Sequence, residues 1–417
     1  MIHKYRLCAL LTVLVVISVT TFTSGVVQAI PGLTSGGMFG SAAAIDNEGN
    51  LLVLGSSVPF SNGQSQAFLF KFVSSLPDSP LSQMACMRTF GNGEPLDTFG
   101  FGVTTDSSDN IYITGTTQTF GGENYNVFLQ KYTSSCNLLY TLQWGGQGND
   151  IPHGITVDAA DNVYITGTTS SFANGINQIF LLKYDPEGDL LFSQTWGTAG
   201  NSYGNGVAAD NLGNVYVVGT TTAYLGVGSQ IILLKYDSFG NLLFQKTVGG
   251  IQNSYGTAVA VDSAGDIYSS GYTYSLGHTP GISAVILLKY DPSGNLLYTT
   301  TWGGKQNDVA TAIATDIDGN VYLTGYTKSY SVTPGVPSAF LLKFNQFGNL
   351  AFQRVWGGNR GDFGYGVAVD AAENAYVTGY TYSFGPNSQG ANFFILKYDV
   401  SGTLQDTKLY GGGIPDP

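Results

Sequence analysis

Hydrophobic and polar residues alternate in short runs along this chain, and turn residues separate the runs. In "GNVYLTGYT" at 319–327, Val321 and Leu323 alternate with Tyr322 and Thr324, between a Gly-Asn pair and a closing Gly325. A period of two over a few residues is typical of a β-strand with one face toward a core. Runs of this kind recur along the whole sequence, so the pattern predicts an all-β protein.

The same nine-residue run returns seven times. Successive copies are 52 to 60 residues apart, measured between their closing glycines. Repeats of this length in an all-β chain are typical of β-propeller blades, each of which is one four-stranded sheet. The copies begin at Gly49, Asp109, Asp161, Gly213, Gly265, Gly319 and Glu373.

Each repeat predicts four antiparallel strands, named A to D in chain order. Strand A resembles "GVAVD" at 366–370 and "GITVD" at 154–158, and strand B is the nine-residue run. Strand C resembles "FLLKY" at 180–184, and strand D resembles "LLFSQTWG" at 190–197. Turns such as "DSAGD" and "DPEGD" join A to B and C to D. The predicted blades are 38–92, 97–146, 150–198, 202–250, 254–304, 308–358 and 362–413.

The repeats also resemble a known family. The consensus "GVAVDxxGNVYVTGYT…FLLKYDxxGNLLxxxxWGG" is similar to the seven-bladed β-propeller (SBBP) repeat and to NHL-type repeats, over residues 38–413. The resemblance implies a propeller of exported microbial proteins and brings no defined catalytic motif. Because the first strand A and the last strand D lie at the two chain ends, we expect each blade to be one repeat. The tail at 411–417 is expected to lie against 36–40.

Residues 1–29 have the features of a signal peptide. Lys4 and Arg6 precede an apolar run at 7–19, and the small residues of 27–29 suit cleavage before Ile30. We therefore expect residues 30–417 to be a secreted or cell-surface propeller without an integral membrane domain. Retention of the segment as an anchor is the alternative.

Charge restricts the class of partner. The formal net charge of the chain is −12, and loss of Lys4 and Arg6 makes it −14. An acidic surface disfavours nucleic acid and anionic lipid, and it suits a soluble monomer. Two cysteines, Cys86 and Cys136, remain after cleavage, and export permits a disulfide between them. They occupy non-equivalent positions in neighbouring repeats, so two free thiols are the alternative.

The variability of the loops indicates which face of the propeller carries a binding site. The A–B turns are uniform, and so are the C–D turns except for an insertion in blade 1, whereas the B–C loops differ in every repeat. Variable loops on a rigid scaffold usually carry binding. We therefore expect the working face to be the one that bears the B–C loops and the D–A connectors.

Two sets of residues on that face are candidate ligand contacts. A short polar residue follows the strand D aromatic in each connector, and the set could hold a cation or hydrogen-bond a sugar; backbone capping is the alternative. An aromatic residue in the B–C loops could dock a glycan or a peptide, with packing as the alternative. The polar set is Asp97, Asp150, Ser202, Ser254, Asp308, Asp362 and Asp416, and the aromatic set includes Phe172, Tyr224 and Tyr330.

Other repeated positions have structural explanations. The Asp that ends each strand A suggests a calcium loop, with Asp316–Asn320 as the best candidate, but calcium takes six to eight oxygens and one turn offers too few. A hairpin Asp that accepts its own turn amides is the preferred interpretation. The strand C lysines, such as Lys71, are expected to pair with these Asp residues. The four Trp of strand D are expected to pack between blades. No cofactor is required by the sequence.

Signals for catalysis are few. His153 and His278 are the two histidines after residue 29, and no HExxH or GxSxG motif is present. They are expected in the blade 3 connector and the blade 5 B–C loop, two blades apart on the working face. They are candidate ligand contacts, and ordinary surface residues are the alternative. The leading hypothesis is an exported, non-catalytic scaffold that binds a glycan, a peptide or a surface protein. A propeller lyase or hydrolase with its site at the axial channel mouth is one alternative, and a structural cell-surface component is another.

Overall fold

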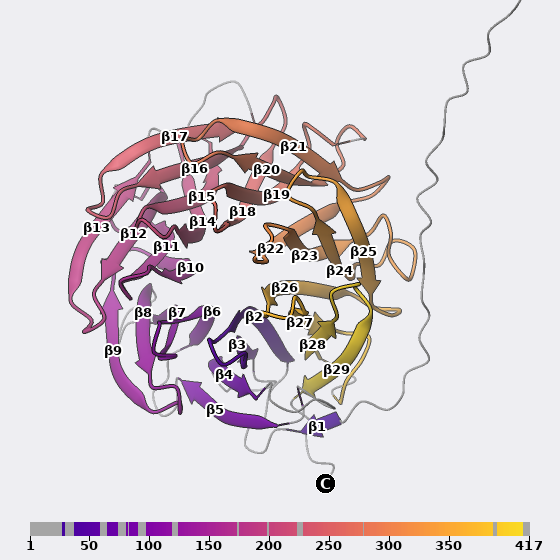
Figure 1. Cartoon of the computed structure of the whole chain (residues 1–417), viewed down its shortest axis with the longest axis horizontal. Coiled ribbons are helices and arrows are strands. Elements are labelled where there is room, and N and C mark those ends of the chain that lie inside the picture. The colour runs from indigo at the N-terminus through magenta and orange to yellow at the C-terminus, as the bar shows by residue number, and fades with distance from the viewer. Residues whose placement is uncertain are drawn as a thin grey trace, which may run out of the picture.

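The structure is a computed structural model, and it is a ring of seven four-stranded sheets (Figure 1). It describes residues 27–29, 37–58, 65–73, 81, 83–90, 97–118, 124–172, 175–197, 200–222, 228–277, 279–386 and 390–411. All regular elements within these ranges are strands. None of them is a helix of the length and apolar character needed to cross a bilayer.

The strands follow one another in chain order around the ring. Blade 1 consists of β2 (Gly37–Ile45), β3 (Leu51–Val58), β4 (Gln66–Phe72) and β5 (Met84–Phe90), and blade 2 of β6 (Thr98–Thr105), β7 (Ile111–Gln118), β8 (Tyr125–Tyr132) and β9 (Leu138–Trp144). Blade 3 consists of β10 (Asp150–Val157), β11 (Val163–Thr169), β12 (Gln178–Tyr184) and β13 (Leu190–Trp196). Blade 4 consists of β14 (Ser202–Ala209), β15 (Val215–Thr221), β16 (Gln230–Tyr236) and β17 (Leu242–Val248).

The second half of the ring has the same organisation. Blade 5 consists of β18 (Ser254–Val261), β19 (Ile267–Thr273), β20 (Ala284–Tyr290) and β21 (Leu296–Trp302). Blade 6 consists of β22 (Asp308–Thr315), β23 (Val321–Thr327), β24 (Ser338–Phe344) and β25 (Leu350–Trp356). Blade 7 consists of β26 (Asp362–Val369), β27 (Ala375–Thr381), β28 (Asn392–Tyr398) and β29 (Leu404–Gly411). In every blade the first strand lies nearest the axis and the fourth lies outside (Figure 1).

The ring closes between blades 7 and 1 without exchange of a strand. Each four-stranded sheet comes from one continuous repeat, as the sequence predicts. Blade 1 meets blade 7 through side-chain packing and the hydrogen bond from the Met38 amide to the Ala391 carbonyl, 3.0 Å long. A short strand β1 (Val27–Ala29) pairs in parallel with β29 at the outer edge of blade 7. The predicted contact between the tail and residues 36–40 falls largely on residues outside the described ranges.

The core consists of the seams between blades. Each of seven buried clusters joins two neighbouring sheets; between blades 1 and 2, for example, Leu54 and Leu69 pack with Ile113 and Phe128. The closing glycine of each nine-residue run is required by close contact within its own blade. A Cβ atom on Gly325 would lie 2.0 Å from the Val309 carbonyl oxygen, because strand A crosses there at close range. The recurrence of that glycine is therefore architectural.

Candidate functional site

The antiparallel order of each blade sorts the connections onto two faces. The A–B and C–D turns lie on one face, and the B–C loops and D–A connectors lie on the other. Seven A strands surround the axial channel (Figure 1).

Every A strand carries a β-bulge at the same point, which the sequence did not reveal. The register with strand B shifts by one residue, for example between Pro152 and Gly154 in β10. The sequence placed strand A from Gly154 onward, whereas β10 begins at Asp150. A bulge bends a strand and re-aims its extra side chain. The bulged residues are Ser41, Phe101, His153, Asn205, Thr257, Thr311 and Tyr365.

Several bulged side chains connect neighbouring blades around the channel. The Asn205 amide nitrogen donates to the Gly256 carbonyl at 2.6 Å. The Thr311 hydroxyl donates to the Gly364 carbonyl at 2.9 Å. Each acceptor is the residue just before the bulge of the next blade, so these hydrogen bonds form part of a belt around the axis.

His153 is one of these bulged residues and not, as the sequence suggested, part of a connector. Its ring lies 5.7 Å from that of Phe101 in blade 2. The side chain is exposed to solvent yet surrounded by protein, as a group inside a channel is, and burial lowers its pKa to about 4. His153 is therefore a neutral imidazole at pH 7. His278 lies outside the described residues, so the pairing of the two histidines stays untested.

Five members of the predicted polar set begin A strands and are fully buried there, namely Asp150, Ser202, Ser254, Asp308 and Asp362. Asp308 accepts the Thr327 hydroxyl at 2.5 Å, the Ser329 hydroxyl at 2.7 Å and the Gly304 amide at 3.0 Å. Asp150 and Asp362 have the same three kinds of partner, two hydroxyls of their own blade and one glycine amide of the connector from the preceding blade. The geometry therefore matches backbone and hydroxyl capping.

The remaining members of the polar set differ in detail. Ser202 and Ser254 are buried beside Thr221 and Thr273, 3.0 and 2.8 Å away. Asp97 precedes β6 and accepts the Ser65 amide of blade 1 at 2.7 Å, so it does not occupy the equivalent position, which belongs to Thr98. Asp416 lies outside the described residues. Ligand binding by this set stays a prediction.

The B–C loop aromatics pack on the Trp of the preceding blade. Ring centroids lie 5.3 Å apart for Trp144 and Phe172, and 4.9 Å apart for Trp302 and Tyr330. Phe172 is still 53% exposed, whereas Tyr330 also donates its hydroxyl to the Gly303 carbonyl at 3.0 Å. Tyr224 lies outside the described residues. These rings cover the ends of the seams, and contact with a ligand stays untested.

A second aromatic group lies on the same face, closer to the axis. We call it the tyrosine band, and it occupies the inner ends of the seams in blades 5 to 7. Blades 5 to 7 read "GYT" at the end of strand B, whereas blades 2 to 4 read "GTT". This difference is the feature of the sequence from which the band could have been recognised. The band consists of Tyr255, Tyr272, Tyr274, Tyr326, Phe363, Tyr365, Tyr380 and Tyr382.

The rings of the tyrosine band contact one another within and between blades. Tyr255 and Tyr272 stack at 4.8 Å in blade 5. Tyr326 of blade 6 meets Phe363 of blade 7 edge-on at 5.1 Å, and Tyr365 stacks on Tyr380 at 5.5 Å. All members are partly accessible, and Tyr365 is 37% exposed. The mouth of the channel on the B–C/D–A face is therefore aromatic on one side.

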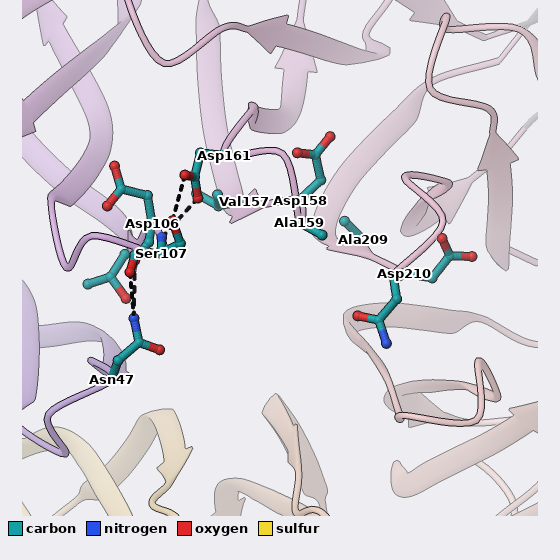
Figure 2. A pocket seen from close by; sticks show the side chains of 11 residues that line it. Asn47, Asp106, Ser107, Val157, Asp158, Ala159, Asp161, Ala209 and Asp210 are labelled. Atoms are coloured by element: carbon teal, nitrogen blue, oxygen red, sulfur yellow. Dashed lines mark hydrogen bonds between the residues drawn. The ribbon is translucent and has the colours of Figure 1, made fainter.

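The opposite mouth holds an open pocket of about 270 Å³ (Figure 2). It lies among the A–B turns of blades 1 to 4, with Asn47, Ser107, Asp158 and Asp210 in its wall. Asp161 adopts a positive φ of 62° at a turn position that is glycine in blades 1, 4, 5 and 6, and Asp109 and Glu373 do the same in blades 2 and 7. Its carboxylate accepts the Ser107 amide of blade 2 at 2.8 Å, so it links two turns.

The Asp that ends each strand A closes its own turn, as preferred from the sequence. In blade 6, one Asp316 oxygen accepts the Asn320 amide at 2.8 Å, and the other accepts the Asn320 side chain at 2.8 Å and the Tyr322 hydroxyl at 3.2 Å. Lys343 lies 3.4 Å from the same carboxylate. Within the described part of the chain, no group of three or more His, Cys, Asp or Glu side chains has the arrangement of a metal site.

The strand C lysines also join neighbouring blades. The Lys71 ammonium pairs with Asp46 at 2.8 Å within blade 1 and donates to the Ser134 carbonyl in the C–D turn of blade 2 at 3.0 Å. Lys183 makes the same kind of interblade bond, to the Ser238 carbonyl at 2.9 Å. The intrablade ion pair predicted from the sequence is therefore only half of the lysine's role.

Cys86 and Cys136 form a disulfide between blades 1 and 2. Cys86 lies on β5, and Cys136 lies in the C–D turn after β8. Cys136 has a positive φ of 62° where the other described C–D turns have glycine. The non-equivalent positions are thus explained, because the bond crosses from a strand of one blade to a turn of the next.

Comparison with known proteins supports the repeat assignment. The SBBP family model, described as "Beta-propeller repeat", matches residues 90–119, 139–174, 193–226, 297–331 and 344–385. Among solved structures, a puromycin hydrolase S511A mutant complexed with PGG has a TM-score of 0.53 at 9% identity, over 88% of this chain and 53% of that one. Sqt1 from Chaetomium thermophilum has a TM-score of 0.49 at 12% identity, over 89% of this chain and 85% of that one. The hydrolase likeness shows the fold alone.

Two curated relatives are much longer than this chain. "Regulatory protein FlaEY" of Caulobacter vibrioides is 27% identical over 58% of this chain and 31% of its own length. "Uncharacterized WD repeat-containing protein L264" of Acanthamoeba polyphaga mimivirus is 25% identical over 74% of this chain and 26% of its own length. The chain therefore spans about a third or less of either relative. The chain is a seven-bladed β-propeller in which five stretches match the SBBP beta-propeller repeat.

Proposed function

We propose that the chain is an exported, non-catalytic binding scaffold that holds its ligand on the B–C/D–A face. The observation that carries the proposal is the tyrosine band at the channel mouth. Half-buried rings that remain accessible are typical of binding surfaces, because each offers a large rigid contact area and a polar edge. The names of the relatives, a regulatory protein and a WD repeat-containing protein, support a binding role.

The fold itself favours this use of the face. The blades are fixed to one another by buried seams and by lysine bonds, so the loops are held on a rigid ring. The A–B turns, in contrast, use most of their polar groups in internal hydrogen bonds. Export follows from the predicted signal peptide at 1–29, of which residues 1–26 lie outside the described residues.

A two-face comparison tests the proposal. The purified chain is screened against glycan and peptide arrays, and each hit is measured again with Tyr326→Ser and with Phe239→Ser. Phe239 is the control because it lies in a C–D turn on the opposite face and is 81% exposed. Binding that is lost in Tyr326→Ser and kept in Phe239→Ser supports the proposed face.

The opposite pattern would place the binding surface on the A–B/C–D face. No hit of any class would favour the structural cell-surface alternative. Fractionation of producing cells tests export separately, since a chain without residues 1–29 should remain inside the cell.

A further inference from the structure

We infer that the tyrosine band binds a neutral polysaccharide strand, whose sugar rings stack on the tyrosine faces around the channel mouth. The inference rests on the proposed binding role of the B–C/D–A face and names the ligand class for it. It does not involve the polar set or the B–C loop aromatics that the sequence suggested.

The arrangement of the band fits a chain of repeating units. Tyr272, Tyr326 and Tyr380 are equivalent residues of three successive blades, each directly after the closing glycine of strand B. Strand A partners widen the platform at two of these positions, where Tyr255 lies opposite Tyr272 and Phe363 lies opposite Tyr380. The rings thus recur once per blade along an arc, and a polymer can contact several of them together.

The chemistry of the band fits a ligand covered with hydroxyl groups. All members except Phe363 are tyrosines, and burial raises the pKa of Tyr272 to about 12, so its phenol keeps its proton. A protonated phenol both donates and accepts hydrogen bonds. A sugar ring has an apolar C–H face that suits an aromatic ring and hydroxyl edges that suit the phenols. A proline-rich peptide would use the ring faces but has fewer groups for so many phenols.

Charge favours a neutral strand over an anionic one. The chain carries a net charge of −12, which repels a polyanion. Among the described residues, the guanidinium of Arg360 lies 5.7 Å from the centre of the Tyr382 ring, at the border of the band. One such contact at the border of the band does not offset the charge of the whole chain. Neutral glycans have no such electrostatic cost.

Affinity gel electrophoresis tests the inference with defined probes. The purified chain runs through gels that contain a mixed-linkage β-glucan, xyloglucan, galactomannan or dextran, with alginate as the anionic probe. A proline-rich decapeptide is measured separately by calorimetry. The variants are Tyr272→Ala/Tyr326→Ala, Tyr326→Phe and, as the opposite-face control, Phe239→Ala. Each lost ring should raise the dissociation constant of the glycan about tenfold.

The expected result is retardation by at least one neutral glycan, abolished in the double variant, reduced less in Tyr326→Phe and unchanged in Phe239→Ala. If the double variant melts early, Tyr274→Ala replaces it, because that residue lies in the bend after β19 and not in a strand. Peptide binding without glycan binding would overturn the glycan inference and leave the scaffold proposal standing. Retardation by alginate alone would also overturn it, and no binding by any probe would overturn both.

Discussion

At the scale of single residues, the buried carboxylate of Asp308 acts as a clamp between a loop and a connector. Asp308→Ala should lower the free energy of unfolding by about 2 kcal/mol, because two hydroxyls and two amides lose their acceptor in a closed site. Urea unfolding measures the change. Ser254→Ala is the matched control at the equivalent position of blade 5, where a single hydroxyl contact is lost and about 1 kcal/mol is expected. Equal losses in the two variants would contradict the clamp.

His153 should make the protein less stable as the pH falls. Its pKa is about 4 in the folded chain and about 6.5 when unfolded, so the unfolded state takes up a proton first. The stability that this difference provides is complete above pH 6.5 and decreases as the pH falls toward 4. Urea unfolding of wild type and His153→Gln near pH 7 and near pH 5 measures it. We expect the free energy of unfolding to fall less between these two pH values in the variant than in wild type. An imidazole of His153 that titrates near pH 6.5 by NMR would contradict the prediction.

The same residues show what could be predicted from the sequence. The sequence predicted that Asp316 closes its own A–B turn, because the Asn320 amide that its carboxylate accepts is only four residues away. The burial of Asp150 and the channel position of His153 did not follow, because both depend on a bulge that no local residue type announces. The lysine bonds to the next blade were also missed, because they join residues about 55 positions apart.

At the scale of elements, the disulfide replaces a contact that other seams make without a covalent bond. A Cβ atom on Gly240 or Gly294 would meet the ring of Phe192 or Phe244 of the preceding blade at 3.1 and 2.8 Å. The turn glycine of one blade thus packs on an aromatic ring of strand D in the blade before. Between blades 1 and 2, Cys86 stands at the place of the ring and Cys136 at the place of the glycine.

This equivalence predicts how the seam responds to substitution. Cys86→Ser should lower the free energy of unfolding by about 4 kcal/mol, because the bond spans 50 residues of the unfolded chain. Cys86→Phe/Cys136→Gly should recover part of that loss, since it rebuilds the ring–glycine contact and relieves the positive φ of residue 136. Thermal melting with and without a reducing agent compares the three proteins. A double variant no better than Cys86→Ser would show that the contact cannot be transferred.

At the scale of the whole molecule, the described contacts that close the ring between blades 7 and 1 are side-chain packing, the hydrogen bond from Met38 to Ala391 and the short pairing of β1 with β29. The number of strands per repeat and the order of blades were predictable, because they follow from the repeat length and the turn residues. The tyrosine band was present in the sequence as "GYT" in place of "GTT". The sequence alone does not show that these tyrosines form one band, because only the closed propeller places three successive blades around the same channel mouth.

Two circular permutants test the closure. In the first, the natural ends are joined and the chain is opened between β17 and β18, so that packing alone closes the ring, now between blades 4 and 5. Its melting temperature should remain close to that of the original chain, because every sheet stays continuous. In the second, the chain is opened between β2 and β3, so that strand A of blade 1 arrives at the C-terminus and completes its sheet with strands from the N-terminus.

The second permutant should unfold more slowly than the first in concentrated urea. Its ends are held by the ladder between β2 and β3, which includes pairs such as Ala43 with Val53, and the ring cannot open without breaking these hydrogen bonds. In the first permutant, opening requires only the separation of a seam, and in the original chain it also involves the three-residue pairing of β1 with β29. If both permutants unfold at the same rate, the seam between the terminal blades is not where unfolding begins, and the ring must open elsewhere first.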